Sequence, residues 1–226
     1  MRDKTDKGLD RRPIKTRETG WANSLANRLA RAGVSPNAIS LAGMFAGVGA
    51  GLSIGATGFG VEPMWLFWLL GAVLVQVRLL CNLFDGMVAV ELGTTSALGD
   101  FFNEAPDRVS DACILVGLGY SAGGTSQMGF LAALMAVLVA YLRAQGKASG
   151  AANEFCGPMA KPQRMFLVTA GALYCAAAPK DWPLVIDTGW GTVPEWVLGV
   201  IILGCLLTAL RRCARITQSL SRPSGQ

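Results

Sequence analysis

One stretch of this sequence reads Asn82-Leu83-Phe84-Asp85-Gly86-Met87-Val88-Ala89-Val90, then eight residues, then Gly99-Asp100-Phe101-Phe102-Asn103-Glu104-Ala105-Pro106-Asp107. It joins two long apolar segments, so its acidic and amide side chains fall at the ends of membrane-spanning helices. Ionisable groups in such helices are costly and are retained mainly at functional sites. The stretch therefore predicts a membrane protein and also the position of its functional site.

Composition supports an integral membrane protein with one domain. Of its 226 residues, 52% are hydrophobic and only 15% are charged, which is too apolar for an ordinary soluble domain. A helix needs about 20 apolar residues to cross a bilayer. The predicted fold is all-α, an integral membrane bundle of six transmembrane helices near residues 38–58, 63–86, 97–119, 127–145, 164–180 and 194–212.

The uneven charge distribution predicts the orientation in the membrane. The net charge is +5, and of the 20 Lys and Arg residues nine lie in residues 1–31, four in 143–164 and four in 211–222. The positive-inside rule then places both termini and the acidic stretch on the cytoplasmic side of the inner membrane. Topology alone accounts for these basic residues, so no nucleic-acid partner is predicted.

Segments outside the bundle are predicted from local patterns. Residues 1–19 form a flexible basic N-terminus, and residues 20–33 form an amphipathic juxtamembrane helix, because Trp21, Leu25 and Leu29 recur every four residues. Ser35 followed by Pro36 and Asn37 starts the first span. The membrane domain covers residues 34–215, and residues 216–226 form a flexible tail.

Small residues in the first span predict close helix packing. Gly43, Gly47, Gly51 and Gly55 lie four residues apart and therefore form one stripe. Such a stripe lets two helix backbones approach closely in lipid. The partner helix belongs to the same subunit or, as the alternative, to a second subunit; we favour the first.

Two polar stripes predict a cation site. Arg78, Asn82 and Asp85 share one face of the second span, and the third span carries a second set on one face, which is Asp100, Asn103, Glu104, Asp107 and Asp111. Carboxylate and amide oxygens suit Mg²⁺, Mn²⁺ or Ca²⁺, and Mg²⁺ is commonly shared with substrate phosphates. The alternative is a set of structural bridges to Arg78 and Arg108. Two arginines cannot balance five acids, so we favour phosphoryl transfer assisted by a divalent cation. The sequence lacks histidine, which excludes catalytic triads that use it.

The stretch resembles the signature of the CDP-alcohol phosphotransferases, DxxDGxxAR followed by eight residues and GxxxDxxxD. The resemblance implies a membrane transferase that moves a substituted phosphoryl group from a CDP-linked lipid to an alcohol acceptor, with release of CMP. It also implies one or two Mg²⁺ or Mn²⁺ ions, a homodimer, and Asp107 as the general base. The implied nucleotide-binding residues are Pro36, Asn37, Asn82, Asp85, Gly86, Ala89 and Gly99.

Three positions depart from the family signature. Asn82 and Asn103 replace the first and third aspartates, and Val90 replaces the arginine. The four-residue site therefore falls from a formal −4 to −2, and nearby acids on the same stripe are expected to compensate. The predicted metal ligands are Asn82, Asp85, Asn103, Asp107, Asp100 and Glu104. We favour a working enzyme, with a non-catalytic relative that keeps the fold and nucleotide pocket as the alternative. A small transporter would not explain the spacing of the motif.

A basic set near the cytoplasmic ends of the fourth and fifth spans is a candidate acceptor site. It consists of Arg143, Lys147, Lys161 and Arg164. Such side chains can bind the phosphate of an alcohol acceptor that is itself phosphorylated. The alternative is that they only set the orientation in the membrane.

Overall fold

The computed structural model describes residues 19–94, 97–179 and 191–221, without the side chains of Ala97, Leu98 and Asp100. The predicted flexible N-terminus falls almost entirely outside these residues. The described chain is all helical, and its helices are α1 (Gly20–Arg31), α2 (Pro36–Ala56), η2 (Thr57–Phe59), α3 (Met64–Glu91), α4 (Ala97–Gly119), α5 (Ser126–Ala148), α6 (Lys161–Ala177) and α7 (Val193–Leu220).

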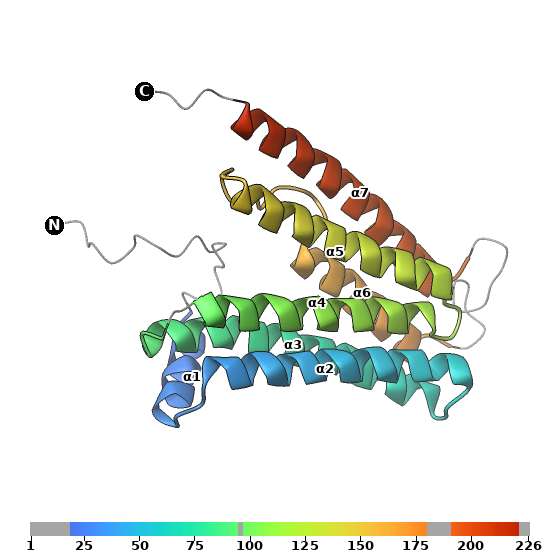
Figure 1. Cartoon of the computed structure of the whole chain (residues 1–226). Coiled ribbons are helices and arrows are strands. Elements are labelled where there is room, and N and C mark those ends of the chain that lie inside the picture. Colours follow the sequence, from blue (N-terminus) through green and yellow to red (C-terminus); the bar gives the residue numbers. More distant parts are fainter. Residues whose placement is uncertain (1–18, 95–96, 180–190, 222–226) are drawn as a thin grey trace.

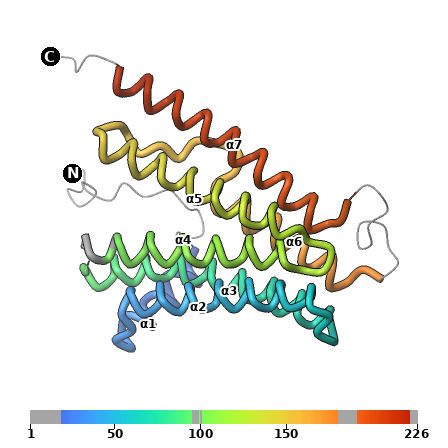
Figure 2. The backbone as a smooth tube through the Cα atoms, turned by 45° about the vertical axis from the view of Figure 1, so that its right-hand side comes forward, coloured from blue at the N-terminus to red at the C-terminus, as the bar shows by residue number. Residues whose placement is uncertain are grey.

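Helices α2, α3 and α4 form one tightly packed group, and α5, α6 and α7 cover it from one side (Figure 1). Helix α5 packs on α4, α6 packs on α3, and α7 packs on α5 and α6. Figure 2 shows from a second direction that α7 leans away from α2, α3 and α4 toward its C-terminal end. The start of α2, the end of α3 and the start of α4 all lie at the end of the bundle where α1 sits.

Each of the six predicted spans contains one helix, although two helices are longer than predicted. Helix α3 continues to Glu91, so Asp85 and Gly86 lie inside it. Helix α7 continues to Leu220, so the predicted tail begins with about one helical turn. Helix α6 ends at Ala177, two residues before Pro179, because the residue that precedes a proline disfavours helical backbone angles.

Helix α1 has an apolar face that was not predicted. Ala22, Ala26 and Ala30 are buried, and they pack in a cluster with Phe84 and Val88 of α3. Trp21 and Leu25, from the predicted apolar stripe, are instead exposed. The small alanines let α1 lie close to α3, while the larger side chains of Trp21 and Leu25 stay exposed on the surface of the helix.

The glycine stripe packs within the chain, as favoured from the sequence. A Cβ atom at Gly47 would lie 2.3 Å from Ser110 Cβ, and one at Gly51 would lie 2.2 Å from the carbonyl oxygen of Cys113. Both contacts are far inside van der Waals distance, so any side chain at these positions would push α2 and α4 apart. This close approach holds the middle of α4 against α2, one turn beyond the motif residue Asp107.

Large apolar side chains cover the outside of the bundle. Phe45, Leu134 and Leu203 are each more than 60% exposed, and many others share this property. Four helices of the described residues are long and apolar enough to cross a membrane, namely α2 continued by η2, α3, α5 and α7. Such a surface is stable against lipid tails and not against water, so the chain is a multi-pass membrane protein.

Candidate functional site

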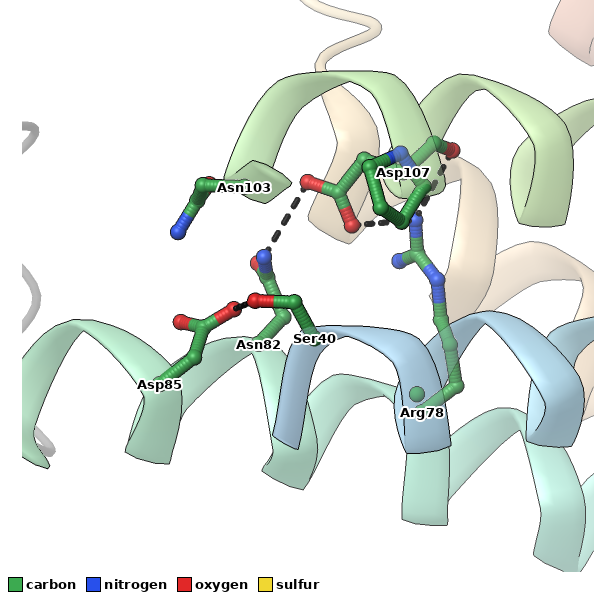
Figure 3. A pocket seen from close by; sticks show the side chains of 8 residues that line it. Ser40, Arg78, Asn82, Asp85, Asn103 and Asp107 are labelled. Atoms are coloured by element: carbon green, nitrogen blue, oxygen red, sulfur yellow. Dashed lines mark hydrogen bonds and ion pairs between the residues drawn. The ribbon is translucent and has the colours of Figure 1, made fainter. Parts of the chain in front are cut away.

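The motif residues of three helices line one small pocket (Figure 3). Helix α2 contributes Ser40 and Gly43, and the remaining lining residues are Arg78, Asn82 and Asp85 of α3 with Asn103, Pro106 and Asp107 of α4. The pocket is narrow and partly open, with a cavity volume of about 10 Å³. All four residues at the signature's acidic positions therefore face the same space, as their spacing predicted.

Asp85 is buried and held by two donors. Ser40 Oγ donates to Asp85 Oδ2 at 2.7 Å, and the amide nitrogen of Gly86 donates to Asp85 Oδ1 at 2.5 Å. No basic side chain bonds to Asp85 in the described part of the chain, so its charge is directed into the pocket. Ser40 was missed in the sequence, where its only signal is a polar residue one turn after Pro36 in an apolar span.

Asp107 is held by groups from two other helices. Arg78 Nη2 donates to Asp107 Oδ1 at 3.1 Å, and Asn82 Nδ2 donates to Oδ2 at 3.0 Å. The Lys161 ammonium group at the start of α6 forms an ion pair with the same Oδ2. Arg78 and Lys161 thus place two positive charges against the predicted general base.

Asp111 lies one turn deeper and joins two buried arginines. Arg78 Nη2 contacts Asp111 Oδ1 at 2.5 Å, and Arg164 Nη2 contacts Oδ2 at 2.8 Å. Arg78 Nε also donates to Ser110 Oγ at 3.0 Å. This buried network ties α3, α4 and α6 together directly beneath the pocket.

More basic side chains lie next to the acidic residues than the sequence indicated. The acids are paired not only with Arg78 and Arg108, as considered from the sequence, because α5 and α6 also bring Arg143, Lys161 and Arg164 to them. Much of the acidic charge on α4 is therefore paired within the protein. Asp85 is the exception, and it leaves the strongest uncompensated negative charge in the pocket.

The structure does not bring Glu104 to the pocket, in contrast to its prediction as a metal ligand. Its carboxylate forms an ion pair with Arg108 and a contact of 2.5 Å with Arg143 Nη2, and the side chain is half exposed. Glu104 follows Asn103 directly, and one step along a helix rotates the side-chain direction by about 100°, so Glu104 points toward Arg143 of α5 instead of into the pocket. The side chain of Asp100 lies outside the described residues.

The four predicted acceptor residues separate in the structure. Lys161 borders the pocket through Asp107, whereas Arg143 contacts Glu104 and lies over the ring of Phe155 at 5.5 Å. Lys147 is exposed. Arg164 is only 2% exposed and donates to Asp111 and to the carbonyl oxygen of Met159. Arg164 is therefore a buried structural residue, which differs from its prediction as a phosphate ligand.

The remaining predicted nucleotide residues surround the pocket without lining it. Pro36 and Asn37 form the first turn of α2, where Ser35 Oγ accepts a hydrogen bond from the amide of Ala38 as predicted for a helix cap. Gly86 is buried beside Asp85, and Ala89 lies one turn further along α3. Gly99 lies in the first turn of α4. Val90 is exposed.

The donor set fits one divalent cation better than two. Carboxylate and amide oxygens are suitable ligands for Mg²⁺ and Mn²⁺, and two of each line the pocket. However, Asp85 and Asp107 carry a formal charge of only −2, and Asp107 is already paired with Arg78 and Lys161. Among the described residues, no three acidic, histidine or cysteine side chains gather closely enough to hold a metal.

No family model matches the chain, but curated proteins do. The archaetidylinositol phosphate synthase of Aeropyrum pernix is 30% identical over 184 residues, which cover 75% of this chain and 89% of that protein. The phosphatidylinositol phosphate synthase of Mycobacteroides abscessus is 29% identical over 187 residues, which cover 80% of this chain and 78% of that protein.

Solved structures show the same fold. The phosphatidylinositol phosphate synthase of Mycobacterium tuberculosis with CDP-DAG bound has a TM-score of 0.71 and 20% identity, covering 91% of this chain and 98% of that chain. The same enzyme in complex with manganese and citrate also has a TM-score of 0.71. The motif spacing, the shared fold and the extended identity agree, and this chain belongs to the CDP-alcohol phosphotransferase family.

Proposed function

We propose that this protein is a membrane phosphatidyltransferase that moves a substituted phosphoryl group from a CDP-linked lipid to an alcohol acceptor and releases CMP. The observation that carries the proposal is the single pocket formed by Asn82, Asp85, Asn103 and Asp107, which occupy the four acidic positions of the signature. Relatives that cover most of the chain are synthases of this reaction type. The reaction serves phospholipid synthesis.

The pocket residues have separate roles in this reaction. The acceptor oxygen forms a new bond to phosphorus while the bond from phosphorus to the CMP oxygen breaks, and CMP leaves with the electron pair. Asp107 accepts the proton of the acceptor hydroxyl as general base. Asn82 orients the Asp107 carboxylate through its hydrogen bond of 3.0 Å. Ser40 holds Asp85 facing the pocket.

The chemistry of the pocket residues fits one Mg²⁺ or Mn²⁺ ion. Asp85 and Asp107, with the amide oxygens of Asn82 and Asn103, are the residues that would hold it. When bound, the ion neutralises charge on the diphosphate as CMP leaves. A relative of the same fold was solved with manganese, which supports the use of a divalent cation.

Lys161 is suited to bind a phosphorylated acceptor. Lys161 is the first residue of α6. Its ammonium group forms an ion pair with Asp107, and its side chain is partly accessible. A phosphate on the acceptor would compete with Asp107 for this ammonium and leave the carboxylate free to accept a proton. The names of the similar synthases support an inositol phosphate or a related phosphorylated alcohol as acceptor.

The arrangement in the membrane follows from helix lengths and charge. Helix α4 has 23 residues and is about 34 Å long at 1.5 Å per residue, which is enough to cross a bilayer. We therefore assign six spans, with α6 as the shortest. The basic segments support a position of both termini and the pocket on the cytoplasmic side of the inner membrane, with α1 at its surface. The family resemblance supports a homodimer.

The test is CMP release by purified protein in lipid nanodiscs with CDP-diacylglycerol, Mg²⁺ or Mn²⁺ and a panel of alcohol acceptors. We expect release with one acceptor class, and Asp107→Asn to lower its rate by about 100-fold or more. Glu154→Gln is the matched control, because it removes an ion-paired carboxylate outside the pocket. CDP binding without release from any acceptor would show the non-catalytic relative instead.

A further inference from the structure

Arg78 has a donor group at the pocket that the rest of the protein does not use. Its side chain is only 1% exposed, and it lines the pocket together with Ser40, Asn82 and Asp107. Nη2 bonds to Asp107 and Asp111, and Nε bonds to Ser110. Nη1 has no hydrogen-bond partner among the described residues. Figure 3 shows the guanidinium group reaching from α3 to the level of Asp107.

An unsatisfied charged donor inside a membrane helix is expensive. A buried polar group that lacks a partner costs its full desolvation penalty, and the penalty is larger for a charged group. Replacing Arg78 with an apolar residue would remove this cost but would also leave Asp107 with one cation fewer. Arg164 Nε is also buried without a partner, but of the two arginines only Arg78 lines the pocket, so Nη1 is the unused donor that a group in the pocket can reach.

The local charge balance indicates that this partner is an anion. Asp111 is shared by Arg78 and Arg164, so these three side chains carry a net charge of +1. Lys161 offsets Asp107. Arg78 is the member of the trio that lines the pocket, and Asp85, which lines it too, brings the net charge of these six side chains to zero. A divalent cation bound to Asp85 therefore gives the pocket an excess of positive charge, which an anion would balance.

The two asparagines of the motif explain why a positive charge from Arg78 would be needed in the pocket. Asn82 and Asn103 remove two negative charges relative to the family signature, and the remaining donor set fits one divalent cation. A diphosphate bound there would lack the positive charge that a second ion supplies. A guanidinium group binds phosphate oxygens well, because its donors are fixed in a planar fork.

We propose that Arg78 binds the diphosphate of a nucleoside diphosphate group in this pocket through Nη1, and that it supplies charge in place of a second divalent ion. This inference rests on the proposed function, because it requires the pocket to hold a CDP group. Arg78 is therefore a substrate-binding residue as well as a structural one, and part of the nucleotide affinity does not depend on metal.

The test compares two arginines that share the same buried aspartate. CDP is titrated into the full-length protein in nanodiscs by calorimetry, with EDTA present to remove divalent ions. We expect wild-type protein to retain measurable CDP affinity. Arg78→Gln should weaken this affinity by about tenfold to 100-fold, the range for one charge-assisted hydrogen bond. Arg164→Gln removes the other cation from Asp111 without touching the pocket, and it should leave the affinity unchanged.

The controls separate the possible failures. Size-exclusion elution and thermal unfolding are compared for all variants. If Arg78→Gln does not fold, Arg78→Lys is used instead, because lysine keeps the positive charge but lacks the planar fork of donors of the guanidinium group. Equal affinities for wild-type protein and a folded Arg78 variant would overturn the inference. An equal loss in Arg164→Gln would also overturn it, since the effect would then be structural. CDP binding that requires metal overturns only this inference, whereas no CDP binding under any condition overturns the proposed function.

Discussion

At the scale of single residues, the two asparagines distinguish this site from the family signature. Asn82 uses its amide nitrogen to bind Asp107, so its carbonyl oxygen remains available to a cation. An aspartate at this position would place a second carboxylate beside Asp107. The asparagine therefore keeps the orientation of Asp107, the proposed general base, and lowers the charge available to hold a metal ion.

The double substitution Asn82→Asp with Asn103→Asp should restore a second ion. It returns the formal charge of the four-residue site from −2 to −4. Two carboxylates then replace two amides, whose oxygens carry no charge to attract a cation. We expect about one Mn²⁺ per chain for wild-type protein and about two for the variant, both with CDP present. Equilibrium dialysis with metal analysis measures the ratio. Equal stoichiometry in the two proteins would show that the asparagines do not limit metal binding.

The residue scale also shows what could be predicted from the sequence. Asn103 and Asp107 lie one helical turn apart, so helical spacing places them on one face of α4 without knowledge of the fold, and the same holds for Asn82 and Asp85 on α3. Ser40 and Lys161 reach the same carboxylates from 45 and 54 residues away. Their partners depend on how α2 and α6 pack against α3 and α4. Periodicity along a single helix does not contain that information.

At the scale of elements, α2 and α4 form the closest contact of the bundle. Gly51 faces the backbone of Cys113, and Gly117 faces the backbone of Gly51 in return. Without side chains at these positions, the two helices approach until their backbones touch. The separation of α2 and α4 at this contact also determines how far apart Ser40 and Asp107 lie across the pocket.

Gly51→Ala should therefore destabilise the protein, although alanine favours helix. Its Cβ atom would lie 2.2 Å from the Cys113 carbonyl oxygen, and relief of such overpacking costs about 1 to 3 kcal/mol. Gly49→Ala is the matched control on the same helix, because its Cβ atom would meet only the flexible end of Leu74, at 3.4 Å. Thermal unfolding in detergent should show a lower midpoint for Gly51→Ala alone. Equal midpoints would contradict the packing account.

Elements also explain why helix boundaries were predicted better than helix contacts. The cap at Ser35 is a local signal, and α2 begins at the next residue as predicted; Pro179 is a second such signal, although the predicted span 164–180 ran past it. The apolar faces of α1 and of the long helices are less informative, because lipid and protein both accept apolar side chains. Ala22, Ala26 and Ala30 were therefore not recognised as the packing face of α1.

At the scale of the whole molecule, the number of membrane crossings decides on which side of the membrane the loop between α5 and α6 lies. Four helices satisfy a simple criterion of length and hydropathy, whereas α4 carries the motif charges and α6 has only 17 residues. If α4 and α6 did not cross, the loop between α5 and α6 would lie outside the cytoplasm. With six spans, the same loop lies inside it.

Labelling of single cysteines distinguishes these two topologies. In a variant without the native cysteines, Asn153→Cys lies in the loop between α5 and α6, and Phe59→Cys lies in the exposed turn between α2 and α3. With intact cells whose outer membrane has been made permeable, a maleimide that does not cross the inner membrane should label only Phe59→Cys. Labelling of Asn153→Cys at the same rate would reject the six-span assignment.

The central claim is that this pocket holds a divalent ion together with a diphosphate. Electron-nuclear double resonance of Mn²⁺ with CDP tests it most directly, because phosphorus coupling to manganese appears only when the diphosphate binds the ion. We predict phosphorus coupling for wild-type protein and for Glu104→Gln, whose carboxylate faces Arg108 and Arg143, and its loss in Asp85→Asn. Wild-type protein without phosphorus coupling, or coupling that survives in Asp85→Asn, would contradict the account.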